Sequence, residues 1–142
     1  MTYLLDTNVL SELRKGPRCN PRVASWFAGV DDQDLGLSVL VIGEIRRGIE
    51  TLRRRDQRRA GTLERWLARL LRDHADRVLA IDGRVTEEWG RLSAVRPGSI
   101  IDVLLAATAR VHGLTLVTRN VRDVEWTGVA WLNPFEPPSV TR

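Results

Sequence analysis

Short apolar runs alternate along this chain with longer segments in which apolar residues recur every three or four positions. The runs lie at residues 3–5, 35–37, 78–81, 114–117 and 129–132. They have the length of buried strands, and the segments between them have the spacing of amphipathic helices. This alternation predicts an α/β domain of three layers, α/β/α, around a central, mostly parallel sheet of four to five strands.

Cap residues mark where several of the predicted helices begin and end. Asn20 precedes Pro21, while Ser38 and Ser99 each precede a segment of helical spacing. Asn and Ser side chains accept hydrogen bonds from the free N–H groups of a first turn, and Pro suits the first helical position. Gly113 follows the last long helix, where a left-handed residue is common. The sequence therefore predicts helices that begin just after these caps.

The length of 142 residues suits one compact domain. We expect residues 1–136 to form it and residues 137–142 to form a loose tail. The composition, with 43% hydrophobic residues, excludes a disordered chain. Asp6 comes too early for a signal peptide, and no apolar run is long enough to cross a bilayer. The single Cys19 excludes an internal disulfide and fits a reducing compartment, so we expect a cytoplasmic protein without membrane contact.

Four acidic residues stand where an α/β sheet usually binds its ligand. Asp6 ends the first predicted strand and Asp123 follows the fourth, while Glu44 and Asp102 lie among apolar residues in the early turns of two helices. Ligands of parallel sheets bind beyond the carboxyl ends of the strands. An acid in an apolar run is costly to bury unless its charge is compensated, and carboxylate oxygens suit Mg²⁺ or Mn²⁺. We expect all four acids to be metal ligands and catalytic residues.

Each acid also has a purely structural interpretation. Asp6 could cap the helix that follows it, and Asp102 has the spacing of a capping-box partner. Glu44 could pair with Arg47 on its own helix, and Asp123 could stabilise a turn. One metal site explains the four acids together better than four separate roles do.

Other polar side chains share these strand ends: Thr7, Asn8, Thr118 and Asn120. They could orient the acids or hold water, and they could equally serve only as helix caps and turn residues. Cys19 has no histidine near it in sequence, and His74 and His112 are expected at the surface of helices. The sequence therefore offers no nucleophile with a neighbouring base to compete with the acids.

Five segments of the chain resemble, in order, the motifs of PIN domains. They are LLDTNVL at 4–10, EIRRGI at 44–49, DVLLAATA at 102–109, TRNVRD at 118–123 and WLNPF at 131–135. The last is similar to the terminal segment of the VapC/FitB-like branch. Because the resemblance covers nearly the whole chain, it implies a PIN-like fold throughout.

The resemblance also implies an activity. PIN domains of this branch are Mg²⁺- or Mn²⁺-dependent endoribonucleases and act as toxins of bacterial type II toxin–antitoxin pairs. By resemblance, Asp6, Glu44, Asp102 and Asp123 are the metal-site acids, although Asn120 stands where some PIN domains carry an acid. A bound cation would polarise a phosphodiester oxygen and acidify a water, which Glu44 could orient or deprotonate. In-line attack would leave a 5′-phosphate and a 3′-hydroxyl.

The implied partners are protein and RNA. VapC-like toxins usually form homodimers and bind a VapB-like antitoxin in a hetero-oligomer. The antitoxin's C-terminal segment wraps the toxin and often places an Arg among the carboxylates, where a guanidinium can pair bidentately. The aromatic residues Trp26, Phe27 and Trp66 could form dimer or antitoxin surfaces, or pack in the core.

The positive charge of the chain is concentrated in one segment. Residues 46–59 hold seven arginines against Glu50 and Asp56, whereas the whole chain has a net charge of +4. We expect an RNA-backbone contact here, formed by Arg46, Arg47, Arg53 and Arg54. A docking face for an acidic partner and a plain solvated helix face are the alternatives.

Two other functions stay open from the sequence. A structure-specific DNA nuclease would use the same carboxylates, but the chain is short and has no evident DNA-binding module. A non-catalytic PIN-like binding module would be expected to lack one or more of the acids, and all four are present. A comparison of RNA and DNA as substrates separates these readings.

Overall fold

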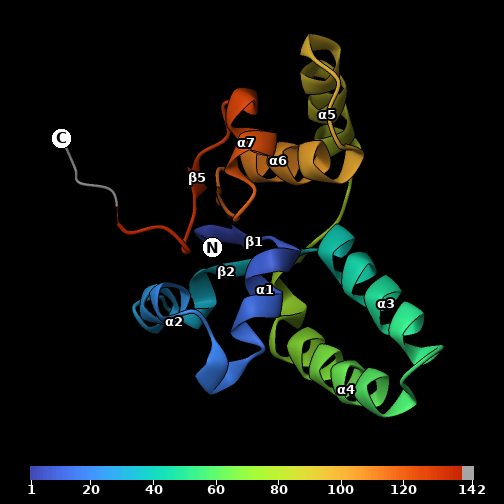
Figure 1. The fold of residues 1–142 in the computed structure, drawn as a ribbon. Helices are drawn as coiled ribbons and strands as arrows, with labels where there is room; N and C mark the ends of the chain where they lie inside the picture. Colours follow the sequence, from blue (N-terminus) through green and yellow to red (C-terminus); the bar gives the residue numbers. More distant parts are fainter. Residues whose placement is uncertain (139–142) are drawn as a thin grey trace.

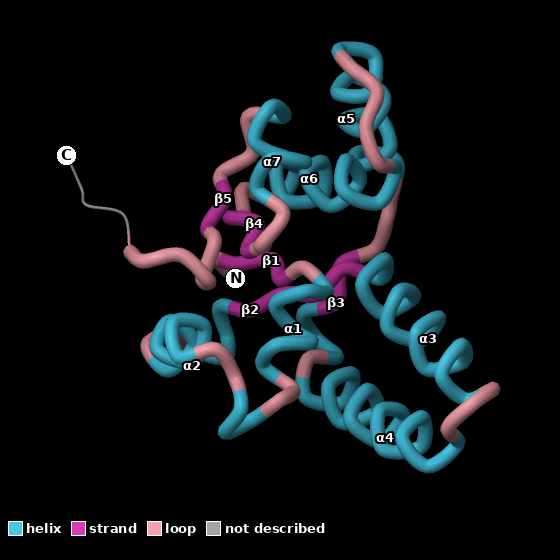
Figure 2. The backbone as a smooth tube through the Cα atoms, in the orientation of Figure 1, coloured by secondary structure: helices cyan, strands magenta, loops and turns pink. Residues whose placement is uncertain are grey.

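A five-stranded parallel sheet runs through the middle of the molecule, between two layers of helices. The computed structural model describes residues 1–138. The strand order is β3-β2-β1-β4-β5, and every neighbouring pair is parallel. Helices α1 to α4 cover one face of the sheet and α5 to α7 lie on the other (Figures 1 and 2). The predicted three-layer α/β/α fold is confirmed.

The strands are short, and most of the helices that connect them span two or more turns. The strands are β1 (Tyr3–Leu5), β2 (Leu35–Ser38), β3 (Val78–Leu79), β4 (Thr115–Val117) and β5 (Trp131–Leu132). The helices are α1 (Thr7–Leu13), α2 (Pro21–Ala28), α3 (Val39–Arg53), α4 (Gln57–Asp73), α5 (Gly83–Val95), α6 (Ile100–His112) and α7 (Val121–Val124).

The strand register brings two distant chain segments to one edge of the sheet. Leu5 of β1 pairs with Val117 of β4, so Asp6 and Thr118 both follow the ends of adjacent strands. The Asp6 N–H donates to the Val117 carbonyl at 2.9 Å, which continues the ladder by one bond. Parallel strands in register end at the same edge, and this edge is where the acids were expected to meet.

The predicted caps are present and explain where the main helices begin and end. The Asn20 side chain accepts from the Arg22 N–H at 2.9 Å, and the Ser38 hydroxyl accepts from the Leu40 N–H at 3.1 Å. Gly113 ends α6 with a φ of +66°, a left-handed conformation that costs glycine little. Each cap satisfies backbone groups that the helix itself leaves unpaired.

Two apolar clusters form the core of the described residues. The larger one fills the space between the sheet and its helices and contains Leu4, Leu116, Val41 and Leu105 among its fully buried members. A smaller cluster around Val85 joins α5 to α6. Burying these side chains is the main favourable contribution to the fold. Within residues 1–138, no helix is long and apolar enough to cross a membrane.

Three predicted strands are shorter than their apolar runs, and one helix was missed. The third strand ends at Leu79 instead of 81, the fourth begins at Thr115 instead of 114, and the fifth covers only residues 131–132. Leu114 and Val129 belong to these runs because the loops that hold them are buried, whereas Ala80 and Ala130 are exposed outside the strands. The four-residue helix α7 is too short for apolar periodicity to reveal it.

The prediction that His74 lies at the surface is wrong. This residue ends α4 and is buried, with Nδ1 at 3.0 Å from the Leu70 carbonyl and Nε2 at 3.3 Å from Asp32 Oδ1. His112 is exposed, as predicted. The domain boundary at residue 136 stays a prediction, because residues 139–142 of the expected tail lie outside the described residues.

Candidate active site

Asp6 is the most deeply buried acid of the candidate site. It caps α1 by accepting the Thr7 N–H at 2.7 Å, and its other oxygen accepts from the Thr118 hydroxyl at 2.8 Å and from the Asn8 amide at 3.5 Å. Burial raises the pKa of Asp6, and the charge of Glu44 adds to the rise, while the bonds from Thr118 and Thr7 oppose it. The structural role as a cap and the role as a site acid are thus compatible.

Glu44 lies in the second turn of α3 and faces the end of β1. The Thr7 hydroxyl donates to Glu44 Oε1 at 2.7 Å, so Thr7 binds Asp6 through its backbone and Glu44 through its side chain. The alternative pairing of Glu44 with Arg47 is absent from the ion pairs of residues 1–138. Two acids that are 38 positions apart in sequence are therefore connected by one threonine.

Asp102 lies in the first turn of α6 and is half-buried. Burial is the largest cause of its raised pKa, and the charges of Asp6, Asp123 and Glu44 raise the pKa further. The Ser99 hydroxyl accepts the Asp102 N–H at 3.5 Å, which is one of the two bonds of a capping box. The electrostatic influence of three acids on a fourth brings all four into one neighbourhood.

Asp123 is the outermost of the four acids. It lies in α7 with an exposed side chain, and its carbonyl accepts the Trp126 indole N–H at 3.0 Å. Within the described residues its carboxylate forms no ion pair, so no cationic side chain of the chain competes with a ligand for it. The turn role is carried by the backbone of Asp123, which leaves the side chain for the site.

The predicted supporting residues connect these acids to the ends of β1 and β4. The Asn8 carbonyl oxygen accepts the Arg119 N–H at 3.2 Å, while its amide donates to Asp6. The Thr118 hydroxyl donates to Asp6 and accepts the Asn120 N–H at 3.0 Å. Asn120 thus contributes through its backbone, and both chain segments are fixed relative to one carboxylate.

The donor set suits a hard divalent cation, although the acids do not form a closed cage. Across residues 1–138, no three acidic, His or Cys side chains are close enough together to enclose an ion as they stand. The charges of Asp6, Asp123 and Glu44 nevertheless reach Asp102, and the ligand atoms of all four side chains are oxygens. Oxygen-only sets on one edge of a sheet fit Mg²⁺ or Mn²⁺, which retain several waters and need few protein ligands.

The arginines expected to contact RNA lie along the α3–α4 hairpin, and two of them are engaged within it. Arg46 contacts Glu64 at 2.6 Å and Glu50 at 3.1 Å, and Arg53 contacts the same two acids. Arg47 and Arg54 are exposed. The role of these four residues in RNA binding stays a prediction.

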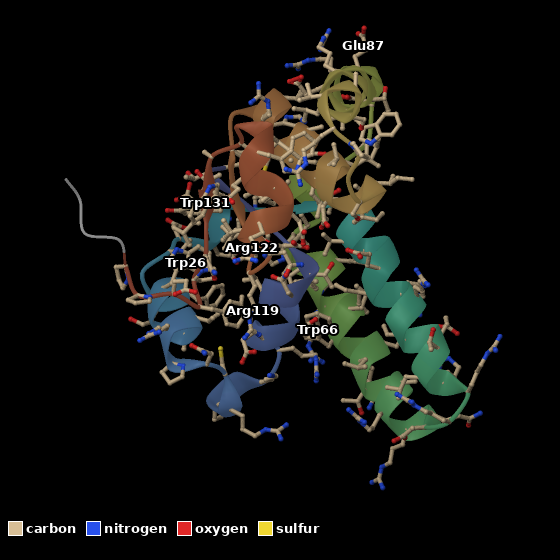
Figure 3. The ribbon with its side chains drawn as sticks, turned by 45° about the horizontal axis from the view of Figure 1, so that its top comes forward. Trp26, Trp66, Glu87, Arg119, Arg122 and Trp131 are labelled. Atoms are coloured by element: carbon tan, nitrogen blue, oxygen red, sulfur yellow. The ribbon has the colours of Figure 1, made fainter. Side chains whose placement is uncertain are left out.

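Two arginines near Asn120 were not among the predicted site residues. Arg119 and Arg122 are exposed, and within residues 1–138 neither forms an ion pair. Figure 3 shows them on the same side of the molecule as Trp26 and Trp131. Their position in the sequence could have revealed them, because the segment 118–123 that contains both arginines also contains Thr118, Asn120 and Asp123.

Known proteins resemble this chain in sequence and in fold. The PIN domain family model matches residues 3–125. "Toxin FitB" of Neisseria gonorrhoeae is 31% identical over 93% of this chain and 97% of its own length. "VapC ribonuclease Y4jK" of Sinorhizobium fredii is 32% identical over 94% and 98%. The crystal structure of FitAcB from Neisseria gonorrhoeae superposes with a TM-score of 0.86 at 30% identity, and covers 96% of this chain and 100% of that one.

Proposed function

Since this chain belongs to the PIN-domain family, we propose that it is a metal-dependent endoribonuclease and the toxin of a bacterial toxin–antitoxin pair. The observation that carries the proposal is the meeting of Asp6, Glu44, Asp102 and Asp123 in one electrostatic neighbourhood at the carboxyl edge of the sheet. The names of the relatives from Sinorhizobium fredii and Neisseria gonorrhoeae support the ribonuclease and toxin roles respectively.

The same four acids would hold Mg²⁺ or Mn²⁺. When bound, such an ion supplies positive charge that stabilises the developing charge on the phosphodiester and lowers the pKa of a water. Asp6 is the anchor of this set, because its orientation is fixed by the Thr118 hydroxyl and the Thr7 N–H. Asp123, which is exposed, provides the adjustable ligand.

Glu44 is the candidate for orienting and deprotonating the attacking water. Its Oε1 is held by the Thr7 hydroxyl, which leaves Oε2 to accept a proton. The water oxygen would attack the phosphorus in line with the 3′-oxygen, and the bond between phosphorus and the 3′-oxygen would break. The products would be a 5′-phosphate and a 3′-hydroxyl. Thr7 is then a positioning residue for both Glu44 and Asp6.

An antitoxin is the proposed protein partner, and the fold offers it a place to bind. A cavity of about 210 Å³ lies among α1, α2 and α4, and Phe27, Trp66, Leu10 and Leu13 contribute to its lining. An apolar segment of an antitoxin would bury these side chains, and an Arg of the same segment would pair with the site acids. A homodimer and a cytoplasmic location complete the proposal.

Growth and cleavage assays test the proposed function. Induced expression of the wild type should arrest bacterial growth, and Asp6→Ala should relieve the arrest. The purified wild type should cut RNA in Mn²⁺ and not in EDTA, while Asp6→Ala should be inactive in both. Equal toxicity of the two proteins, with equal cleavage, would refute the assignment.

The same purified protein separates the two alternative functions. A DNA nuclease would cut a branched DNA substrate at least as fast as RNA of the same length. A non-catalytic binding module would cut neither, and its toxicity would be unaffected by Asp6→Ala. We expect cleavage of single-stranded RNA and none of DNA.

A further inference from the structure

An open groove of about 930 Å³ lies on the α2 and β5 side of the molecule. Its walls come from α2, from β5, from Val121 of α7 and from the segment 133–138 that follows β5. None of the roles described above uses this groove. Its volume is that of a site for a ligand of a few hundred daltons or for a few residues of a polymer.

Aromatic side chains form part of the groove wall. Trp131 on the edge strand β5 is 44% exposed, although large apolar side chains are usually buried. Trp26 of α2 also lines the groove and is braced by Tyr3, whose ring meets it edge-on at 5.4 Å between centroids. Trp131 is thus exposed and Trp26 is partly buried, and indole rings at a surface are where unpaired bases stack.

Three exposed arginines surround these rings. Arg22 lines the groove, Arg122 follows the lining residue Val121, and the Arg119 guanidinium lies 4.6 Å from the centroid of the Phe135 ring. In residues 1–138 none of the three forms an ion pair. The described lining residues themselves hold one arginine, Arg22, and one acid, Glu136, so the positive excess comes from Arg119 and Arg122 beside the groove.

Arg119 also connects the groove to the carboxylate site. Its backbone N–H donates to Asn8 Oδ1, and the Asn8 amide donates to Asp6. Its side chain stacks on Phe135, which stands between the lining residues Pro134 and Glu136. A strand whose phosphate sits among the acids therefore has a positively charged surface beside it that leads into the groove.

We propose that this groove binds the single-stranded RNA that extends from the scissile phosphate, and the proposal rests on the ribonuclease function proposed above. Arg119 and Arg122 contact the phosphates nearest the cut, and unpaired bases stack on Trp131 and Trp26. Positive side chains along the backbone combined with aromatic rings for the bases are the usual means of binding single strands. The α3 arginines are then dispensable for RNA contact.

A second copy of the chain is the less suitable occupant. In a two-fold dimer both sides of the interface present the same surface, so Arg22, Arg119 and Arg122 of each copy would be concentrated in one interface. Like charges at an interface oppose association, and the single acid Glu136 on each copy cannot neutralise three arginines. RNA, in contrast, carries the complementary charge at every phosphate.

RNA affinity measured in an Asp6→Asn background, which blocks cleavage, tests the proposal. Fluorescence anisotropy of a labelled oligouridylate is recorded over a series of salt concentrations. Arg119→Gln with Arg122→Gln should weaken binding about tenfold at low salt and reduce the slope of log K against log salt by about 1.4, or 0.7 for each lost phosphate contact. Trp131→Ala should weaken binding about fivefold or more and leave the slope unchanged.

Two further pairs of arginine substitutions serve as a control and as a test of the alternative RNA contact on α3. Arg58→Gln with Arg59→Gln removes the same charge from exposed positions of α4 and should change affinity by less than about twofold. A larger loss for Arg47→Gln with Arg54→Gln than for the Arg119 and Arg122 pair would overturn the proposal in favour of α3.

Other outcomes overturn the proposal without touching the ribonuclease assignment. If the wild type cuts RNA but the Arg119 and Arg122 pair binds it as tightly as the Arg58 and Arg59 pair does, the groove is not the RNA path. If Trp131→Ala leaves RNA affinity intact but converts a dimer to a monomer in light scattering, the groove is a contact between copies. A wild type that cuts no RNA would instead refute the proposed function itself.

Discussion

At the scale of single residues, Asp6 depends on the neighbours that hold it. Its carboxylate is 6% exposed and accepts bonds from Thr7, Thr118 and Asn8. Bonds to the charged form oppose the rise in pKa that burial causes, so they favour the ionised carboxylate and orient it. A buried ligand of this kind is only as effective as the hydrogen bonds around it.

Thr118→Val tests the contribution of one such bond. Valine fills the space but cannot donate, so Asp6 Oδ2 keeps only the 3.5 Å bond from Asn8 and the pKa of Asp6 rises further. We expect apparent Mn²⁺ affinity and RNA cleavage to fall about tenfold. Calorimetric Mn²⁺ titration and cleavage rates measure both, and Thr118→Ser should restore most of the loss. A serine variant as weak as the valine variant would show that packing, not the hydroxyl, matters here.

Asp102→Asn tests the mutual repulsion of the acids. The pKa of Asp102 is raised above its ordinary value of 3.8, so the stability it contributes is present when the carboxyl is protonated and is lost as the pH rises through the raised pKa. Without divalent cations, the asparagine variant should therefore be more stable than the wild type at pH 7.5, by about 0.5 kcal/mol for a half-buried group. Thermal unfolding in EDTA measures the difference, which should shrink as the pH falls toward 4. A variant less stable than the wild type at pH 7.5 would contradict the repulsion.

At the scale of elements, Arg77 fixes the entrance to β2. It is buried, and its guanidinium donates to the Leu35 carbonyl at 3.0 Å, to the Asp73 carbonyl at 3.2 Å and to Asp32 at 2.9 Å. These bonds connect the end of α4 to the first residue of β2. Since β2 leads directly into α3, the position of Glu44 also depends on these bonds of Arg77.

Arg77→Met should lower the free energy of unfolding by about 2 kcal/mol, because the buried Leu35 carbonyl and the part-buried Asp73 carbonyl both lose the guanidinium donor. Arg77→Lys should be nearly as unstable, since an ammonium group cannot reproduce the fork of the guanidinium. Urea unfolding measures both variants. Arg72→Met is the control, because Arg72 is exposed and its contact with Asp73 is 3.8 Å long. Wild-type stability of the lysine variant would show that only charge is needed.

At the scale of the whole molecule, the fold concentrates acidic groups where they repel one another. A divalent cation that binds only the folded chain should stabilise it, by about 2.7 kcal/mol at a hundredfold excess over its Kd. The melting temperature should therefore rise when Mn²⁺ replaces EDTA. Asp6→Asn combined with Asp102→Asn should abolish the rise, while Glu87→Gln, at an exposed position of α5 that Figure 3 labels, should preserve it. An equal rise in the double variant would place the cation elsewhere.

Local chemistry was sufficient to predict much of this molecule from its sequence. The strand runs, the caps Asn20, Ser38 and Ser99 and the stop at Gly113 depend on interactions within a few residues, so they could be recognised without a structure. The order of the motifs likewise indicated the PIN-domain family, and the match of the family model to residues 3–125 confirms it.

Only the tertiary structure decided what depends on contacts between distant segments. Three such contacts join residues far apart in the chain. Thr7 donates to Glu44, Arg46 and Arg53 pair with Glu64 within the α3–α4 hairpin, and the buried His74 contacts Asp32. Sequence patterns report local preference, whereas these contacts follow from the register of the parallel strands and the packing of helices on them. The charge of an arginine is written in the sequence; whether that charge is already paired is a property of the fold.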